Sequence, residues 1–260
     1  RALSAMRSRD PGIGAGRCTR VTTIVGPVTT DPGSCCSAGS GTDPGSGLRA
    51  EPATGFGPLR ARRHLGTVAA GAAVTVGVAR TLPPDGAATP FDEAMSEPVD
   101  TALDPHPWLA EVFALPTNTW VVLALLCAGA AWFAWQRRWW ETAVMMLAPQ
   151  VAVAVNAWVL KPVWSRPLHD YLAYPSGHTV HLISVATIFV LLIESLRARI
   201  VLVSLTVCAL LVGGIGMIAL DYHHPTDILG GAGAAVALSA LFHWAATTVG
   251  WAYARRAPLA

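Results

Sequence analysis

The sequence has few charged residues, and only one of them is a lysine. Of its 260 residues 13% are charged and 53% hydrophobic, and the mean hydropathy is +0.46. Globular domains average about 25% charged residues, so this composition is typical of a membrane protein. The net charge is only +2, and the basic residues do not form a face that could bind nucleic acid. We therefore expect a bilayer, and no nucleic acid, as a partner.

Cysteine is also scarce. The five cysteines are divided between an N-terminal Gly/Ser-rich region and apolar runs, where a thiol behaves as a small hydrophobic side chain. They predict neither a disulfide framework nor a metal site. The single lysine, Lys161, follows an apolar run, and so compact a charge at that place needs an explanation.

Residues 1–58 lack a sustained apolar pattern. Such a segment cannot bury enough surface to offset its conformational entropy. We predict that it is disordered or, since the chain begins with Arg1, partly an artefact of translation from an upstream start. Residues 64–254 are expected to form one domain.

Six uncharged or nearly uncharged runs follow, separated by short charged breaks. A helix needs roughly 20 apolar residues to cross the bilayer core. The predicted helices are 64–83, 112–135, 142–160, 179–193, 200–220 and 228–254. Arg80 weakens the first, and the fourth is short. The sequence thus predicts an all-α fold, an integral membrane bundle of six transmembrane helices.

Arginine marks alternate breaks. These residues are Arg60, Arg62, Arg63, Arg137, Arg138, Arg197, Arg199, Arg255 and Arg256. Positively charged ends face the cytoplasm, which predicts cytoplasmic termini in the cell (plasma) membrane. The other breaks, among them 161–178 and 221–227, are then expected at the outer face.

The break at 161–178 has the composition of an anion site. Ser176 is a good N-cap, which leaves the amides of Gly177 and His178 at the positive end of a helix. Lys161 supplies a compact charge and Arg166 a planar fork for a tetrahedral oxyanion. We interpret this set as a phosphate cradle.

The break at 221–227 adds a histidine and a carboxylate. His223 and Asp227 are four residues apart, so one helical turn brings them together. A carboxylate on one ring nitrogen leaves the other as nucleophile or base. With His178 as proton donor to the leaving alkoxide, the pattern favours phosphoryl transfer through a phosphohistidine.

Three motifs carry a family resemblance. In order and spacing, KPVWSRP at 161–167, PSGH at 175–178 and HHPTD at 223–227 resemble the type 2 phosphatidic acid phosphatases, which are related to the vanadium haloperoxidases. The likeness covers about residues 64–250. It implies a membrane phosphatase without a cofactor, acting on an isoprenoid or glycerolipid phosphate or diphosphate at the outer membrane face.

The resemblance also implies residue roles. It makes His223 the nucleophile, Asp227 the residue that orients it, and His178 the general acid. It assigns the phosphate oxygens to Lys161, Ser176 and Gly177.

Two positions depart from the family pattern. Arg166 follows Lys161 after four residues where the family usually has six, and we expect it to serve as the phosphate ligand. Met217 stands six residues before His223, where the family usually has an arginine. Because loss of a clamping arginine can cost orders of magnitude in rate, a non-catalytic lipid-phosphate binding or transport-associated protein is the alternative.

Two further alternatives concern the histidines. His224 competes with His223 as nucleophile but lacks the four-residue spacing to Asp227. His178 and His181, with a histidine and an aspartate of the second loop, could ligate zinc. The nearby cationic side chains oppose a metal, so none is expected.

Overall fold

The computed structural model describes the backbone of residues 58–256 and the side chains of residues 64–249. The segment predicted to be disordered, residues 1–58, lies outside the described residues except for Pro58.

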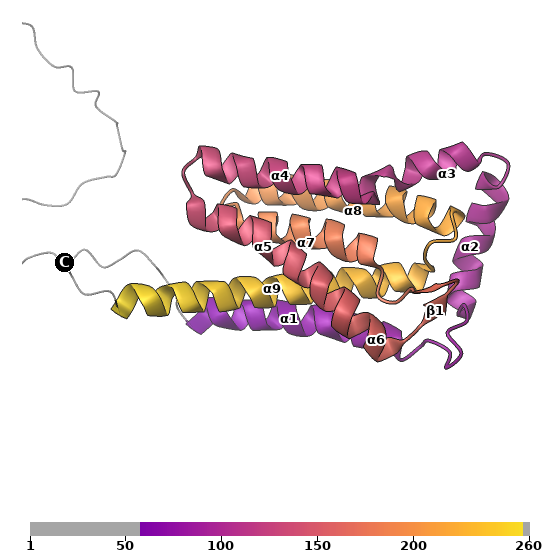
Figure 1. Cartoon of the computed structure of the whole chain (residues 1–260), viewed down its shortest axis with the longest axis horizontal. Helices are drawn as coiled ribbons and strands as arrows, with labels where there is room; N and C mark the ends of the chain where they lie inside the picture. The colour runs from indigo at the N-terminus through magenta and orange to yellow at the C-terminus, as the bar shows by residue number, and fades with distance from the viewer. Residues whose placement is uncertain (1–57, 257–260) are drawn as a thin grey trace, which may run out of the picture. The chain divides into compact units, whose positions relative to one another are not determined.

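All six predicted apolar segments are helical, and they run side by side as a bundle (Figure 1). They are α1 (Pro58–Ala79), α4 (Thr119–Trp135), α5 (Trp139–Val155), α7 (Gly177–Leu192), α8 (Leu196–Ala219) and α9 (Pro225–Arg256). Two of these helices, α4 and α5, are extended by short elements. Helix α3 (Pro107–Ala114) and the 3-10 turn η1 (Leu115–Thr117) precede α4, and the π-helical turn η2 (Asn156–Leu160) leads from α5 into α6 (Lys161–Trp164).

Four continuous helical segments are long and apolar enough to cross a membrane. They are Pro107–Trp135, Trp139–Trp164, Leu196–Ala219 and Pro225–Val249, and two apolar helices, His64–Ala79 and Gly177–Leu192, are shorter. Large hydrophobic side chains face outward on these helices, among them Leu205 and Leu211 on α8. A belt of this kind is unfavourable in water and stable against lipid. The chain is an integral membrane protein.

The shorter α7 is the centre of the bundle, because it packs against α4, α5, α8 and α9. Val180, Ile183 and Ile188 are among its buried side chains. A helix that is apolar on all sides belongs in a protein interior. Burial by its neighbours explains how so short an apolar segment is stable here.

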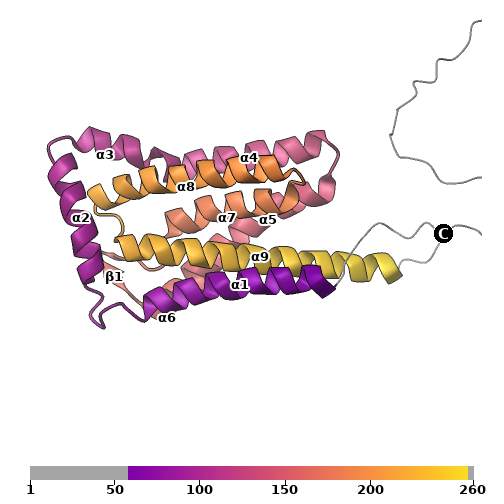
Figure 2. The same cartoon turned by 180° about the vertical axis from the view of Figure 1, so that it is seen from behind.

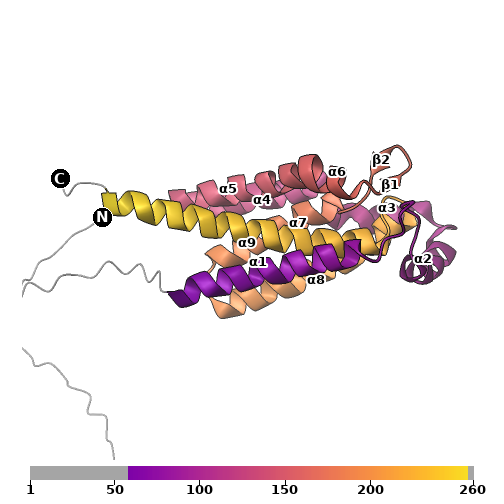
Figure 3. The same cartoon turned by 90° about the horizontal axis from the view of Figure 1, so that it is seen from below.

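One helix was not predicted. The acidic break after the first segment contains α2 (Pro90–Leu103), which crosses the end of the bundle in Figures 1 and 2. Its start is a capping box, in which Asp92 N–H donates to Thr89 Oγ1 (3.1 Å) and Thr89 N–H donates to Asp92 Oδ2 (3.0 Å). The same end carries a two-stranded hairpin of β1 (Pro167–Leu168) and β2 (Tyr171–Leu172), seen edge-on in Figure 3.

Helices α1 and α9 approach closely at glycines. A Cβ on Gly71 would lie 2.6 Å from the carbonyl oxygen of Gly233, and one on Gly233 would lie 2.7 Å from that of Gly71. Small residues allow this backbone approach, which is a common way to pack helices in membranes.

We expect Gly71→Ala to lower the thermal midpoint of the detergent-solubilised protein by several degrees. The added methyl group meets backbone atoms that cannot rotate away, and overpacking costs about 1–3 kcal/mol. Gly77→Ala, on the same helix, is the matched control, since no atom lies within 4 Å of a Cβ there. That variant should be neutral or slightly stabilised. Tryptophan fluorescence during heating reports both midpoints, and equal values would contradict the packing account.

Candidate active site

The two loops predicted to hold the reactive side chains meet at one end of the bundle. The ring centroids of His178 and His223 are 5.8 Å apart, with the ring planes at 72°. Ser176 N–H donates to the carbonyl oxygen of Asp227 (3.0 Å), which ties the start of α7 to the start of α9. Tertiary packing thus places the PSGH loop against the HHPTD loop.

The arginine-containing breaks lie at the opposite end. Arg138 donates to the carbonyl oxygen of Leu192 (3.4 Å), and Arg199 Nε donates to that of Ile193 (2.7 Å). Both acceptors are at the end of α7, whereas the histidine site is at its start. The two ends of the bundle are therefore chemically different.

The start of α7 is held rigidly. Ser176 Oγ accepts hydrogen bonds from Thr179 N–H (3.4 Å) and Thr179 Oγ1 (3.2 Å), and it is fully buried. Asn156, in the π-helical turn, donates through Nδ2 to the carbonyl oxygen of Pro175 (3.2 Å). Gly231 has no room for a side chain, because its Cβ would lie 2.8 Å from the carbonyl oxygen of Ser176. The first amides of α7 are thus presented at a fixed place.

Lys161 enters the same region from α6. Its Nζ donates to the carbonyl oxygen of Leu172 and lies 5.8 Å from the ring centroid of Tyr171. It borders a cavity of about 730 Å³, lined by Asn118, Thr119, Leu123, Gln150, Val153, Lys161, Tyr171, Gly177, His178, His181, Tyr222 and His223. Four of the predicted site residues line this cavity, namely Lys161, Gly177, His178 and His223.

His223 and Asp227 are neighbours, as their spacing predicted. His223 Nδ1 lies 3.8 Å from Asp227 Oδ2 and has no hydrogen-bond partner. This is longer than a hydrogen bond, although catalytic hydrogen bonds are often long in free enzymes and shorten with substrate bound. His224 instead contacts Asp227 Oδ2 through its backbone N–H (3.0 Å). The contact favours His223 as the histidine whose ring the aspartate orients.

Arg166 is placed elsewhere than expected. It is 2% exposed and is not among the residues that line the cavity with Lys161. Its guanidinium donates to Gly86 O (3.1 Å), Ala87 O (2.8 Å), Thr226 Oγ1 (2.7 Å), Asp227 Oδ1 (2.8 Å) and Asp92 Oδ2 (3.1 Å). The donors of Arg166 are thus engaged by protein acceptors, among them Asp227, the residue predicted to orient His223.

Asp92 is a site-supporting residue that sequence reasoning missed. It accepts hydrogen bonds from Thr226 N–H (2.8 Å) and Thr226 Oγ1 (2.9 Å) and pairs with Arg166. Burial alone would raise its pKa, but the amides of Thr89 and Thr226 together with Arg166 hold the pKa below its usual value. The T-P-F-D sequence at 89–92 is a capping-box signal that could have revealed the helix, though not its long-range partner.

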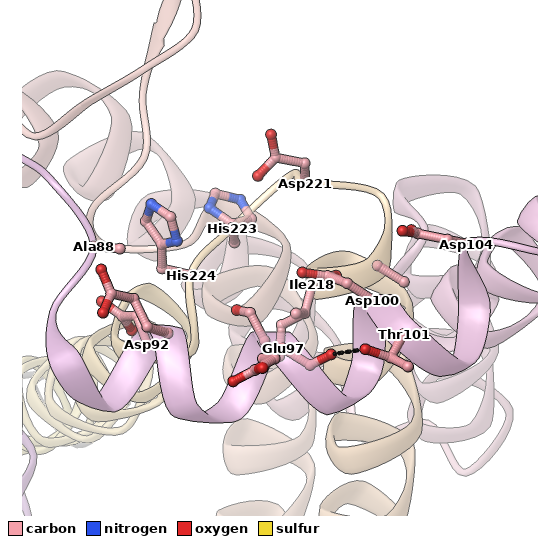
Figure 4. Close-up of a pocket in the computed structure, with 13 residues that line it drawn as sticks. Ala88, Asp92, Glu97, Asp100, Thr101, Asp104, Ile218, Asp221, His223 and His224 are labelled. Atoms are coloured by element: carbon pink, nitrogen blue, oxygen red, sulfur yellow. Dashed lines mark hydrogen bonds between the residues drawn. The ribbon is translucent and has the colours of Figure 1, made fainter.

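His223 also lines a second cavity, of about 620 Å³ (Figure 4). Its carboxylates are Asp92, Glu93, Glu97, Asp100, Asp104 and Asp221, and His224 also lines it. Burial, with Asp104 and Asp221 nearby, raises the pKa of Asp100. Because these carboxylates repel an anion, a phosphate is favoured on the Lys161 side of His223.

Two other predictions from the sequence concern Met217 and the zinc alternative. Met217, at the position where the family usually has an arginine, is buried, with 1% of its surface exposed. Among the side chains of residues 64–249, no group of three or more His, Cys, Asp or Glu could hold a metal ion, the zinc alternative included.

We expect Asp92→Ala to destabilise the protein strongly, because breaking a buried ion pair costs about 3–5 kcal/mol. The adjacent Glu93→Ala is the matched control and should change stability little, since Glu93 is exposed. Thermal midpoints of the purified proteins at neutral pH measure both effects.

The effect of Asp92 should depend on pH in a defined direction. Its pKa in the folded protein is lowered, so its contribution is complete above the ordinary carboxyl pKa of about 3.9 and is lost as the pH falls through the lowered value. The difference between parent and Asp92→Ala should be constant near pH 7 and shrink below about pH 4. A difference that grows as the pH falls would contradict this assignment.

Comparisons with known proteins agree with the fold and the motifs. Residues 155–251 match the family model of the PAP2 superfamily. No match to a curated protein was found. A solved structure, the "first transmembrane PAP2 type phosphatidylglycerolphosphate phosphatase from Bacillus subtilis", matches with a TM-score of 0.52 and 21% identity over 73% of this chain and 96% of that chain. At this identity the likeness shows the fold. The matched residues 155–251 contain every predicted site residue, and the match agrees with the resemblance to the type 2 phosphatidic acid phosphatases.

Proposed function

We propose that the protein is a membrane phosphatase that hydrolyses a lipid phosphate or diphosphate through a phosphohistidine. The observation that carries the proposal is the pair of imidazoles, His178 and His223, with centroids 5.8 Å apart. They share a cavity with Lys161 and the start of α7, and Asp227 lies behind His223. The match of residues 155–251 to the PAP2 superfamily model and the name of the similar solved structure support the same reaction class.

In the first step the phosphate oxygens accept hydrogen bonds from Lys161 and from the amides of Gly177 and His178. His223 Nε2 attacks phosphorus while Asp227 holds the opposite ring nitrogen. The bond from Nε2 to phosphorus forms as the bond from phosphorus to the lipid oxygen breaks. His178 gives its proton to the departing alkoxide, which is otherwise a poor leaving group.

In the second step water attacks the phosphohistidine. His178, now neutral, accepts a proton from the water as its oxygen bonds to phosphorus. The bond between phosphorus and His223 Nε2 breaks, and inorganic phosphate leaves. Both histidines return to their starting states, so no cofactor is needed.

Arg166 has a positioning role in this mechanism. It bonds Asp227 Oδ1, and the His224 amide bonds Oδ2, so the carboxylate cannot rotate freely. A buried carboxylate without a partner is strongly unfavourable. Arg166 therefore keeps Asp227 aimed at His223, while Lys161 and the helix amides hold the phosphate, with Ser176 as the N-cap.

For the membrane arrangement, we propose six spans in one domain, residues 64–254. The four long helical segments are completed by α1 and by the enclosed α7. Since Arg138 and Arg199 bind the end of α7 opposite the histidines, the positive-inside rule places both termini in the cytoplasm and the site at the outer face of the plasma membrane.

A non-catalytic lipid-phosphate binder or transport-associated protein is the second candidate function. One observation favours it: among the described residues, Lys161 is the only lysine or arginine that lines the cavity, because Arg166 is engaged elsewhere and Met217 replaces the family arginine. A single cation stabilises a phosphoryl transition state less than the usual clamp does. Binding without turnover would distinguish this function.

We expect the purified protein in detergent, without added metal, to release inorganic phosphate from lipid phosphates. His223→Ala and His178→Ala should each lower the rate by at least about 100-fold, because the first removes the nucleophile and the second the proton donor. His224→Ala is the matched control and should retain most of the activity.

After an alkaline, denaturing quench, ³²P from a labelled lipid phosphate should remain on the parent protein, be lost on acidification, and be absent from His223→Ala. A protein that binds lipid phosphate or vanadate but releases no phosphate from any lipid would establish the binder. Full activity in His223→Ala with loss in His224→Ala would exchange the roles of the two histidines.

The topology predicts where the C-terminus lies. A fluorescent protein fused after Ala260 should fluoresce and an alkaline phosphatase fused there should be inactive, because the phosphatase needs disulfides that form only outside the cytoplasm. As a control, the same reporter inserted between Pro83 and Pro84, in the loop before α2, should report the outer face. An external C-terminus would place the site in the cytoplasm and contradict the proposed orientation.

A further inference from the structure

The cavity at the candidate site extends past the phosphate region toward the interior of the bundle. Beyond Lys161, Gly177 and His178 it is lined by Leu123 and Val153, which are apolar, and by two polar side chains, His181 and Gln150. The proposed mechanism uses neither polar residue. Their presence beside Leu123 and Val153 needs a separate explanation.

His181 is three residues after His178 on α7, so it lies on the same face of the helix about 4.5 Å further along its axis. It is 7% exposed, and its buried Nε2 has no hydrogen-bond partner among the residues whose side chains the structure describes. An unpartnered buried ring nitrogen is unfavourable. A bound group that reaches this depth would satisfy it.

Gln150 approaches from the facing helix. It belongs to α5, inside the apolar segment Trp139–Trp164, and its side chain is exposed beside the cavity. A polar side chain within a membrane helix is costly and usually faces a bundle interior or a binding cavity. Its amide can donate or accept, as a neutral imidazole can. The two residues therefore offer hydrogen bonds to the same cavity from two neighbouring helices.

The position of the phosphate decides which part of a lipid they meet. With the phosphate at Lys161 and the start of α7, the atoms beyond the leaving oxygen lie at the level of His181. In a glycerolipid phosphate the ester carbonyls occur there, a few bonds from phosphorus. In an isoprenoid phosphate only hydrocarbon is present, which would leave His181 and Gln150 unpartnered.

We propose that His181 and Gln150 form a hydrogen-bonding subsite for the ester carbonyls of a glycerolipid phosphate. The subsite makes the protein prefer glycerolipid over isoprenoid substrates. This inference rests on the proposed phosphatase function and names the substrate class of the same site.

The test compares two lipids of equal chain length, a diacylglycerol phosphate and its dialkyl ether analogue, which lacks the carbonyls. The parent should have the higher kcat/KM on the diacyl lipid. His181→Phe and Gln150→Leu should each lower that value about tenfold and change the value for the ether lipid by less than about twofold. An isoprenoid phosphate should behave as the ether lipid does.

Two further variants separate this role from a general defect. His181→Gln keeps a hydrogen-bonding side chain and should retain part of the preference. His243→Phe removes another largely buried histidine, which lines a different cavity with Arg138 and Arg199, and should leave the preference unchanged. Equal losses on both lipids, or no loss on either, would overturn the subsite.

Failure of the proposed phosphatase function can be distinguished from failure of the subsite. If the parent releases no phosphate from any lipid, the phosphatase proposal fails, and the subsite is tested by binding of non-hydrolysable phosphonate analogues of the same two lipids. The parent should bind the diacyl phosphonate more tightly, and His181→Phe should remove the difference. Equal affinities of the parent for the two phosphonates would overturn the subsite as well.

Discussion

The end of the bundle that holds the candidate site depends on one interaction, the ion pairing of the buried Arg166 guanidinium. It is shared by two fully buried carboxylates, Asp92 from α2 and Asp227 from α9. Charges removed from water are tolerated only when they are paired and hydrogen-bonded, so these three side chains fix one another. Helix α2, the loop before it and the start of α9 are thereby locked together. The position of the Asp227 carboxylate, 3.8 Å from His223 Nδ1, follows from this network.

The second constraint is electrostatic, because His223 lines two cavities that differ in charge. On one side the single lysine and the start of α7 attract an anion, and on the other the carboxylates of α2 and Asp221 repel it. An anion is therefore favoured in the cavity that Lys161 lines, where Leu123 and Val153 are also present.

The six apolar helices and the alternation of arginine breaks could be predicted because they depend on composition over whole segments, which tertiary contacts rarely override. The proximity of His223 and Asp227 was predictable for a local reason, the four-residue spacing at a helix start. Helix α2 was missed because its acidic sequence looked like a loop. Its capping box was readable, but its stability comes from the distant partners Arg166 and Thr226.

Arg166 shows most clearly where sequence reasoning ends. Its charge and its place between Lys161 and the PSGH motif favoured a phosphate ligand, and nothing local distinguishes that role from a structural one. By itself the sequence determined the membrane-bundle class, the chemistry of the reactive side chains and their pairing within each loop, since these follow from composition and short spacings. Only the tertiary structure decided that Arg166 faces two carboxylates, that Met217 is buried, and that His181 and Gln150 border one cavity. These facts depend on contacts between residues far apart in the chain, and no local pattern encodes them.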